Sequence, residues 1–364
     1  MTFTSACCLL AKGTVDDGVI SSTPMIPLKG NQRPQNSARK KVTRKRQSEH
    51  GNQQQLHGVI VVDKPAGKSS AGIVAEVKRI LKADKVGHAG TIDPFAEGVL
   101  LCCVNNATRL ARFLLHGNKK YEATLKLGVE TDTQDSTGSV ISTGDPADLS
   151  ETRIQSAIKQ HEGPGLQLPP VYSALKHKGV PLYKLARRGR PFQKPPRHIY
   201  INDIIIRDIN IPLVRFEVTC SAGTYIRTLC ADIGKSLGCG GHLQALKRTE
   251  SSGFSLSQAH TISEIKQTAL AGNPADLMVS MADILKDMPE HRADGQLLEK
   301  IRNGRILHKT DLISGQAFKQ MKKPQSYIKI LDLWNNLVAV LDCREEKDRL
   351  EYCCVFHNRS CLPG

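Results

Sequence analysis

The sequence predicts an α+β fold, in which a mixed, largely antiparallel sheet is flanked by helices and followed by a small C-terminal β domain. Strand-like and helix-like runs follow one another without the regular rhythm of parallel βαβ units. The chain has 364 residues, enough for two or three domains and a sizeable core. From about residue 275 the texture changes to short apolar strands, which indicates a separate β unit.

Residues 1–55 differ from the rest of the chain. They are rich in Ser, Asn, Gln and Pro and end in a basic run, ARKKVTRKRQ at 38–47. Such a composition cannot bury enough apolar area to offset its ordering entropy, so we predict a disordered basic tail. Organelle targeting, and a nuclear or RNA-tethering role for the basic run, are alternatives to a plain solvated extension. Asp16 and Asp17 argue against organelle targeting, and we expect a cytoplasmic protein.

Regular structure is expected to begin at His57. The run GVIVVDKPAG (58–67) predicts a strand followed by a Pro-Ala-Gly turn, and Ser69 and Ser70 then cap a helix. The apolar positions of this helix share one face, at Ile73, Val74, Val77, Ile80 and Leu81. The run 98–104 predicts a buried strand, and 107–117 predicts a helix closed by Gly117.

The middle of the chain continues this mixture. Residues 121–128 alternate as a strand does, and 149–163 predict a helix capped by Ser150. Two strands are expected at 199–209 and 214–221. The following helix is expected over 224–238, ending at Gly238.

The C-terminal part predicts a compact β unit. A short helix is expected within 297–307, after a linker region at 286–296. Three strands are expected at 327–333, 335–342 and 350–356. The predicted domains are therefore the tail 1–55, a main domain 56–285 with an insertion at about 168–197, and a β domain with its tail over 286–364.

The charge of the chain favours a polyanionic partner. The sequence has 51 Lys+Arg and 35 Asp+Glu, a formal net charge of +16. Because this charge is spread through the predicted folded part as well as the tail, nucleic acid is favoured over a role in solubility only. Aromatic residues make up 4% of the chain, which argues against a sequence-neutral stacking platform for single strands.

The eleven cysteines predict neither a metal site nor a disulfide framework. There is no C-x-x-C spacing in the sequence, and three pairs are adjacent. An odd number without framework spacing fits a reducing compartment, and Cys102 and Cys103 are expected to be buried free thiols in a strand. The sequence also has no run of about 18 apolar residues, so we predict no membrane span.

The stretch GHAGTIDPFAEGVL (87–100) holds one carboxylate, Asp93, in a glycine-flanked loop before an apolar strand. Such a carboxylate could cap a helix, bind a metal or react with a carbon atom. A strand-like run follows it, which argues against a helix cap. Of the metal-binding side chains, His88 is the one nearby in sequence, which makes a metal site a poor interpretation. A reactive carboxylate would need a neighbouring cation to hold it ionised.

Residues 87–100 closely resemble the catalytic motif of the TruB-type pseudouridine synthases. Further blocks resemble other motifs of this family in the family's order: the lysine-proline motif at 57–70, the tyrosine motif at 119–138, the RNA-gripping insertion at 168–190, and the arginine and leucine motifs at 221–254. Ala89, Ile92 and Phe95 depart from the commoner residues of the motif. The C-terminal β unit is similar to a small RNA-binding PUA domain. The resemblance implies the pseudouridine synthase fold.

The resemblance also implies a reaction, the isomerisation of a uridine in RNA to pseudouridine. The N1–C1′ bond breaks, the base turns, and C5 bonds to C1′. Because the atoms balance, no cofactor is implied. Asp93 matches the family's essential acid, which acts as a nucleophile or as a base at the sugar. Members of the family that act by themselves modify position 55 in the T-loop of tRNA.

Four other positions match residues around this acid. Arg227 matches the arginine that pairs with Asp93, and Tyr121 matches a tyrosine that stacks on the target base. Tyr225 and Leu246 match residues that line the pocket of the flipped base. Without the resemblance, Tyr121, Tyr225 and Leu246 would be interpreted as packing residues and Arg227 as a surface arginine.

The remaining matches concern RNA. Lys64 resembles a lysine that steadies the motif loops, and His88 a histidine that pushes into the RNA loop. The segment 176–197 is dense in Lys and Arg, with glycines and prolines at its ends, and predicts a mobile flap that closes on RNA phosphates. Its candidate phosphate-binding residues are Lys176, Lys178, Arg187 and Arg188.

The sequence leaves alternatives to a tRNA enzyme. RNA-guided relatives similar to dyskerin share the aspartate motif but lack the insertion, so the insertion favours an enzyme that acts on the T-arm of tRNA without a guide. We expect a monomer that needs no protein partner. A guide-dependent rRNA enzyme, or a tRNA-binding chaperone without chemistry, are the competing hypotheses.

Overall fold

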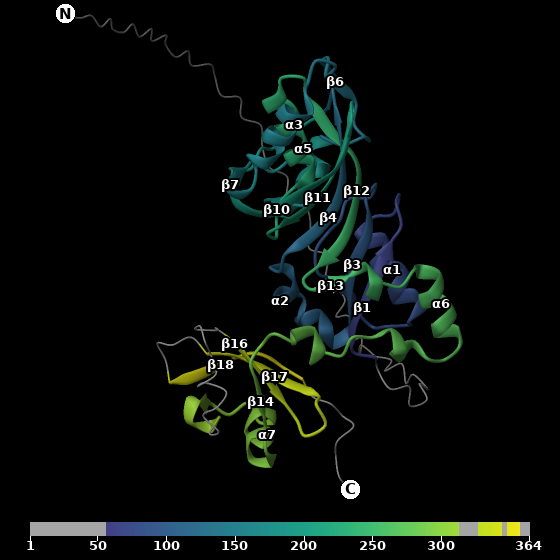
Figure 1. Ribbon diagram of the computed structural model, residues 1–364. Helices are drawn as coiled ribbons and strands as arrows, with labels where there is room; N and C mark the ends of the chain where they lie inside the picture. Colours follow the sequence, from purple (N-terminus) through teal and green to yellow (C-terminus); the bar gives the residue numbers. More distant parts are fainter. Residues whose placement is uncertain (1–55, 313–326, 344–347, 357–364) are drawn as a thin grey trace, which may run out of the picture. The chain divides into compact units, whose positions relative to one another are not determined.

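The computed structural model describes residues 56–312, 327–343 and 348–356 (Figure 1). By their contacts, these described residues form one compact unit. The predicted tail at 1–55 lies outside the described residues. The division predicted at 285/286 stays a prediction.

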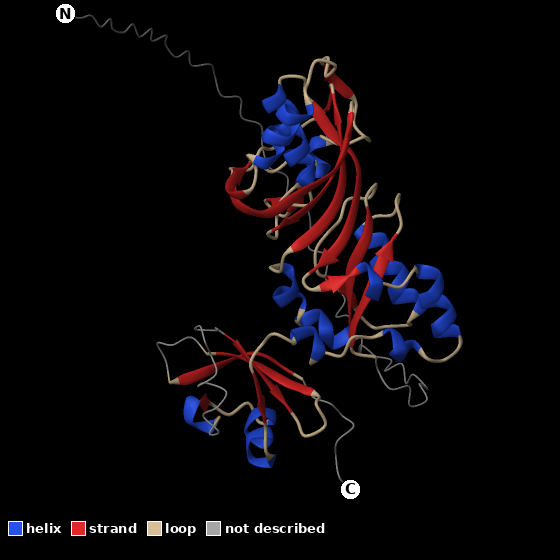
Figure 2. Cartoon of the chain, in the orientation of Figure 1, coloured by secondary structure: helices blue, strands red, loops and turns tan. Residues whose placement is uncertain are grey.

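Among the described residues, nine strands form the main sheet (Figure 2). Seven of them lie in the order β1-β3-β12-β4-β11-β10-β7, with β2 beside β3 and β13 beside β12. Their bounds are β1 Gly58–Lys64, β2 Val86–His88, β3 Glu97–Val104, β4 Lys119–Leu127, β7 Gly163–Gln167, β10 Arg197–Asn210, β11 Leu213–Cys220, β12 Gly241–Ser251 and β13 Phe254–Ser255. In this sheet β12 and β3 pair in parallel and the other neighbours are antiparallel. This confirms the predicted α+β class.

The helices begin and end at the residues that local chemistry favours. The main ones are α1 Ser70–Ile80, α3 Glu151–Lys159, α5 Ile226–Leu237 and α6 Ile262–Leu270. The Ser69 and Ser150 hydroxyls accept hydrogen bonds from backbone N–H groups in the first turns of α1 and α3. Gly238 ends α5 with φ 84°, a conformation that glycine adopts readily. Figure 1 shows α3 and α5 side by side, and α1 beside α6.

Helices α3 and α5 cover one face of the sheet, where the strands are apolar. Along β4, side chains alternate between buried and less buried positions, as a half-buried strand requires. Phe216 of β11 and Leu125 of β4 are fully or almost fully buried in this core, together with Ile154 of α3 and Ile233 of α5. On β3 both faces are buried, and Cys102 and Cys103 lie there as free thiols, as predicted.

Two expectations were wrong in detail, and one strand was missed. The helix predicted at 107–117 is a 3-10 turn, η1 Asn105–Arg109, followed by the short helix α2 Ala111–Leu115. At its end the Lys119 ammonium donates to the Leu115 carbonyl at 2.8 Å, which satisfies a carbonyl that the helix leaves free. The predicted linker contains a strand, β14 Glu290–Arg292, which is too short to show a period in the sequence. Strand β12, near the middle of the sheet, was not predicted.

The insertion carries its own small elements. They are β8 Lys176–His177, β9 Val180–Pro181 and α4 Leu182–Ala186. Strands β8 and β9 form a two-stranded ribbon. A second ribbon, β5 Val129–Thr131 with β6 Val140–Thr143, follows β4.

A second sheet forms the C-terminal part, and within the described residues it has five strands in the order β14-β16-β17-β18-β15. The predicted strands are β16 Tyr327–Leu331, β17 Leu337–Asp342 and β18 Arg349–Val355, and β15 is Leu307–His308. Helix α7 Gly295–Arg302 packs against this sheet through Leu297 and Ile301. The other 3-10 turns of the described residues are η2 Leu256–Gln258, η3 Pro274–Leu277, η4 Asp283–Leu285 and η5 Lys309–Asp311. None of the helices in the described residues is both long and apolar enough to span a membrane.

The closest approach of α5 to the sheet predicts a stability effect. A Cβ at Gly234 would overlap the backbone of Gly240 and Gly241, which cannot move without disturbing β12. We expect Gly234→Ala to lower the free energy of unfolding by about 1–3 kcal/mol through overpacking, measured by chemical denaturation. Gly295→Ala is the control, because a Cβ there has nothing within 4 Å. Equal stability of the two variants would contradict the close packing of α5 on β12.

Candidate active site

Asp93 lies in the loop between β2 and β3, and buried side chains hold the backbone of this loop. The Ser70 hydroxyl exchanges two hydrogen bonds with the Ile92 backbone, each 3.0 Å. The ammonium of Lys64, a fully buried residue, donates to the carbonyls of Pro65 (2.8 Å), Lys68 (2.7 Å) and Pro94 (3.1 Å). The residue after Asp93 is thus fixed to the turn that follows β1.

Arg248 of β12 holds the other side of the loop. Its guanidinium is buried and donates to the carbonyls of Val99 (2.7 Å), Thr91 (3.2 Å) and Gly90 (3.2 Å). In the sheet Arg248 is the register partner of Tyr121, which is also buried. Because charged donors bond more strongly to carbonyls than neutral donors do, Arg248 fixes two residues shortly before Asp93.

Arg227 in the first turn of α5 pairs with Asp93. Its Nε lies 2.9 Å from Asp93 Oδ2, and its Nη2 donates to Asp93 Oδ1 at a longer 3.4 Å. The Arg227 side chain is 4% exposed and that of Asp93 is 32% exposed. The pair therefore presents the carboxylate, and not the guanidinium, to a ligand.

A second carboxylate, Asp135, lies behind the guanidinium. Its Oδ2 is 3.3 Å from Arg227 Nη1, and its side chain is 5% exposed. Its Oδ1 accepts hydrogen bonds from the hydroxyls of Thr133 (2.8 Å) and Thr137 (2.6 Å) and from the Thr137 N–H (2.9 Å). Arg227 also donates to the Thr133 carbonyl at 3.0 Å. With its acceptors occupied, Asp135 holds Arg227 from the side opposite Asp93.

Burial and neighbouring charges shift the pKa values of Asp93 and Lys64. Burial raises the pKa of Asp93, and the negative charge of Asp135 adds to the rise, whereas Arg227 and Lys64 lower the pKa. Burial lowers the pKa of Lys64 to about 8. Arg227 and Lys64 thus offset part of the cost of burying the Asp93 carboxylate.

The pKa values of Tyr121 and His88 are shifted as well. Burial raises the pKa of the Tyr121 hydroxyl, while Arg248, which hydrogen-bonds this side chain, lowers it. Burial lowers the pKa of His88, and Arg248 lowers it further. At neutral pH His88 is therefore uncharged, which favours a wedge or hydrogen-bonding role over a phosphate contact.

Of the predicted pocket residues, Tyr225 is the N-cap of α5, two residues before Arg227, and the Arg197 guanidinium lies 4.5 Å from its ring centre. Leu246 lies on β12 and lines a cavity of ≈ 340 Å³ together with Phe95. Three charged residues on neighbouring strands also line this cavity, where Lys247 pairs in register with both Glu97 and Glu122.

The four candidate phosphate-binding residues lie in the insertion and are exposed, as their proposed role requires: Lys176, Lys178, Arg187 and Arg188. Arg187 lies 5.7 Å from the Tyr183 ring centre, and His177 stacks on Phe192 at 3.7 Å between ring centroids. Both of these ring contacts are made within the insertion. The four basic residues thus form a solvent-facing surface, whereas Arg227 beside Asp93 is buried.

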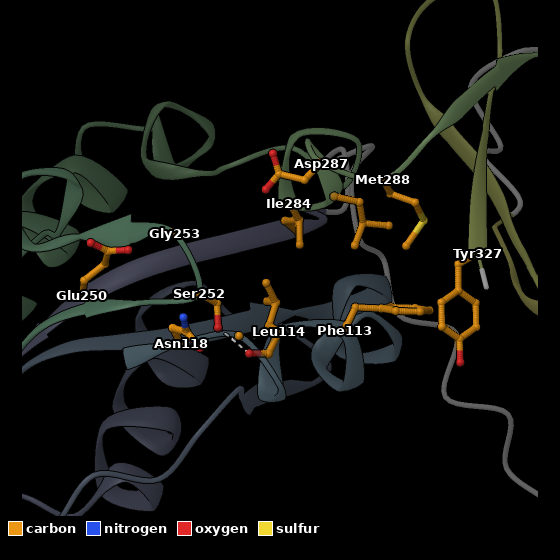
Figure 3. Close-up of a pocket in the computed structure, with 12 residues that line it drawn as sticks. Phe113, Leu114, Asn118, Glu250, Ser252, Gly253, Ile284, Asp287, Met288 and Tyr327 are labelled. Carbon is orange, nitrogen blue, oxygen red and sulfur yellow. Dashed lines mark hydrogen bonds between the residues drawn. The ribbon is translucent and has the colours of Figure 1, made fainter. Parts of the chain in front are cut away.

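A larger cavity of ≈ 500 Å³ lies elsewhere (Figure 3). Phe113 and Leu114 of α2 line it with Tyr327 of β16, and Phe113 and Tyr327 meet edge to face. None of the predicted site residues lines it. Among the described residues, no three His, Cys, Asp or Glu side chains converge as metal ligands would.

Sequence reasoning missed two residues of the site, Asp135 and Arg248. Both lie inside blocks that resemble family motifs, and no local pattern in the sequence distinguishes Arg248 from the other basic residues of its block. Asp135 is followed by Thr137 in the run TDTQDSTG, a local cluster of hydroxyl donors around an acid. This signal does not show that the Asp135 side chain reaches Arg227.

Two protein-family models match the chain consecutively. The model described as "TruB family pseudouridylate synthase (N terminal domain)" matches residues 78–226. The model described as "tRNA pseudouridylate synthase B C-terminal domain" matches residues 227–301.

Curated relatives and solved structures agree with these models. The chain is 44% identical over 249 residues to tRNA pseudouridine synthase B of Geobacter sulfurreducens, covering 68% of this chain and 82% of that protein. It is 37% identical over 315 residues to the protein of the same name from Syntrophus aciditrophicus, covering 84% and 100%. A solved structure titled as a Cbf5-Nop10-Gar1 complex matches with TM-score 0.62 and 27% identity, covering 83% of this chain and 86% of that chain.

The ion pair between Asp93 and Arg227 predicts a shift in the pKa of Asp93 that can be measured. We expect the Asp93 carboxyl to titrate above the ordinary value of 3.8, because burial penalises its charged form. Arg227→Gln should move the midpoint higher still, since the guanidinium favours the carboxylate. Carbon-13 NMR of aspartate-labelled protein measures both midpoints, with Asp93→Asn to assign the signal. If Arg227→Gln did not move the titration midpoint of Asp93, the ion pair would be contradicted. The control is Asp208→Asn on an exposed part of β10, which should leave the Asp93 midpoint unchanged.

Proposed function

We propose that this chain, which belongs to the TruB family of pseudouridine synthases, isomerises uridine 55 in the T-loop of tRNA to pseudouridine and that Asp93 is its essential acid. The observation that carries the proposal is the 2.9 Å pair between Arg227 and the partly exposed Asp93. The relatives named tRNA pseudouridine synthase B, which are 44% and 37% identical, support tRNA as the substrate.

The reaction asks for a single carboxylate at the ribose. The N1–C1′ bond of the uridine breaks, the base turns within the site, and C5 bonds to C1′, while the proton on C5 is lost and N1 gains one. Asp93 acts either as nucleophile at C1′ or as base at the sugar. Arg227 orients the carboxylate and favours its ionised form. Asp135 holds the Arg227 guanidinium in place, so that it does not move when a ligand binds.

The pocket residues have roles that fit their positions. Tyr121 lies near enough to Asp93 that the carboxylate raises the pKa of its hydroxyl, and we assign it to stacking on the base and to proton transfer. Leu246, on the wall of the 340 Å³ cavity, and Tyr225, before Arg227, pack around the flipped uracil. Lys64 fixes Pro94 and so the direction of the acid.

The uridine must leave its stack to reach this site, at a cost of about a few kcal/mol. Phosphate contacts of the basic insertion offset that cost, through Lys176, Lys178, Arg187 and Arg188. His88, uncharged and partly buried at the start of the aspartate loop, supports the opened RNA loop. No cofactor is required, since the reaction rearranges the atoms of the substrate. We further propose that the chain acts as a monomer in the cytoplasm without a protein partner.

A guide-dependent rRNA enzyme is the second candidate. It is favoured by the 27% identity to a chain of the Cbf5-Nop10-Gar1 complex. The higher identity to the tRNA enzymes and the presence of the insertion support the first candidate. The purified chain acting on a bare T-arm transcript separates the two, because a guide-dependent enzyme would leave that RNA unmodified.

Asp93→Asn should abolish the reaction while leaving RNA binding nearly intact. The amide keeps the shape of the side chain but cannot act as nucleophile or base, so we expect the rate to fall by roughly 10⁴-fold or more. Pseudouridine in a transcript with one T-loop uridine measures the reaction, and filter binding measures the Kd. Asp208→Asn is the control. Pseudouridine formed at an undiminished rate would remove Asp93 from the mechanism.

Binding should weaken steeply with salt, and the insertion should account for part of that slope. Replacing Lys176, Lys178, Arg187 and Arg188 by Gln should reduce the slope of log K against log salt by about 1 for each phosphate that the variant no longer neutralises. Lys266→Gln, an exposed lysine on α6, should leave the slope unchanged. An unchanged slope in the fourfold variant would show that the insertion does not bind phosphates.

A further inference from the structure

Both ends of the insertion are fastened to the same short segment, residues 223–227, which ends in Arg227. The insertion leaves the sheet after β7, which ends at Gln167, and returns at Arg197, the first residue of β10. Three separate contacts join the insertion and its ends to 223–227. The segment therefore links the RNA-binding insertion to the residue that orients Asp93.

Gln167 makes the most specific of these contacts. It is buried, and its side-chain amide pairs with both backbone groups of Tyr225: Nε2 donates to the Tyr225 carbonyl at 2.9 Å, and Oε1 accepts from the Tyr225 N–H at 2.7 Å. Tyr225 is the N-cap of α5 and has no side-chain capping bond of its own. The start of α5, which carries Arg227 in its first turn, is thus held by the residue at which the insertion begins.

Arg197 makes the contact at the other end. Its guanidinium donates to the Gly223 carbonyl and lies 4.5 Å from the Tyr225 ring centre. Gly223 has φ 92°, and a Cβ there would meet the Arg197 guanidinium. The returning end of the insertion therefore presses on the same two residues, Gly223 and Tyr225, from the side of the ring.

A third contact joins Arg227 to Tyr172, which lies within the insertion. Its Nη2 donates to the Tyr172 carbonyl at 2.9 Å, and the same nitrogen donates to Asp93 Oδ1 at 3.4 Å. A movement of the insertion that shifts Tyr172 changes what this nitrogen can bond to. The guanidinium has limited freedom to compensate, because its opposite side is fixed by Asp135.

We propose that Gln167 and Arg197 are positioning residues for the isomerisation, which clamp the two ends of the insertion to residues 223–227 and so set the Arg227–Asp93 geometry. The inference rests on the proposed function and adds to it a route from RNA contact at the insertion to the acid. Because both ends are fastened to residues 223–227, a displacement of the insertion on RNA binding is transmitted to Arg227 and so to Asp93.

The test compares Gln167→Met with the matched variant Gln258→Met. Methionine keeps the length of the side chain and removes both hydrogen bonds to Tyr225. Gln258 also bonds a backbone N–H, that of Ser255 at 3.0 Å, but lies in η2 outside the site. Single-turnover rates, tRNA Kd and the pH dependence of the rate are measured for both variants and the wild type.

We expect Gln167→Met to lower the single-turnover rate by about tenfold or more, with Kd within twofold of the wild type. The acidic limb of its rate profile should move to higher pH, because Arg227 then does less to favour the ionised carboxylate. Gln258→Met should match the wild type in all three measurements. A rate within twofold of the wild type, or a lower rate with an unmoved acidic limb, would overturn the clamp.

A second variant covers the case in which Gln167→Met does not fold. Arg197→Lys keeps the charge but loses the planar contact with Tyr225, and it should lower the rate and move the limb in the same direction. An unmoved limb in folded Arg197→Lys overturns the proposal. If the wild type makes no pseudouridine, the proposed function fails. The carbon-13 titration of Asp93 in these variants then still tests the clamp, because it needs no RNA.

Discussion

The site depends on keeping one guanidinium buried. Removing an ion from water costs several kcal/mol unless its donors find well-placed acceptors. Arg227 meets this condition with Asp93 and Asp135 and with the carbonyls of Thr133 and Tyr172. These acceptors come from the loop after β2, the loop after β5 and the insertion. The burial of Arg227 therefore requires three segments that are distant in sequence to meet at the start of α5.

The backbone around the acid is held in the same way. The loop from Gly90 to Pro94 has little regular structure, and its carbonyls would be costly to bury without donors. Lys64 and Arg248 supply charged donors from β1 and β12, the two strands that flank β3. Each such bond contributes about 1.5–3 kcal/mol. Lys64, one of these two cations, also lowers the pKa of Asp93, so one side chain acts on both the position and the charge of the acid.

Charge acts at two ranges in this chain. The net charge of +16 and the exposed basic residues of the insertion favour polyanions such as RNA, over a distance that salt limits to about 10 Å. The buried cations next to Asp93 are screened much less, and Arg227 pairs with both Asp93 and Asp135. Gln167 and Arg197, at the two ends of the insertion, contact the residues just before Arg227, so the proposed clamp would link the two ranges.

The sequence determined those features whose cause is local. Ser69, Ser150 and Gly238 mark the ends of helices because capping depends on a few neighbouring residues, and alternation revealed β4. Asp93 and Arg227 were found through motif resemblance, and their 2.9 Å approach agrees with it. Strand β12 was not predicted from the sequence, because two register irregularities interrupt its alternation. They lie between Leu243 and Ala245 and between Arg248 and Glu250. The partners of Asp135, Arg248 and Gln167 were decided by tertiary structure, since each bonds a residue brought near by sheet order and helix packing, to which sequence spacing gives no guide.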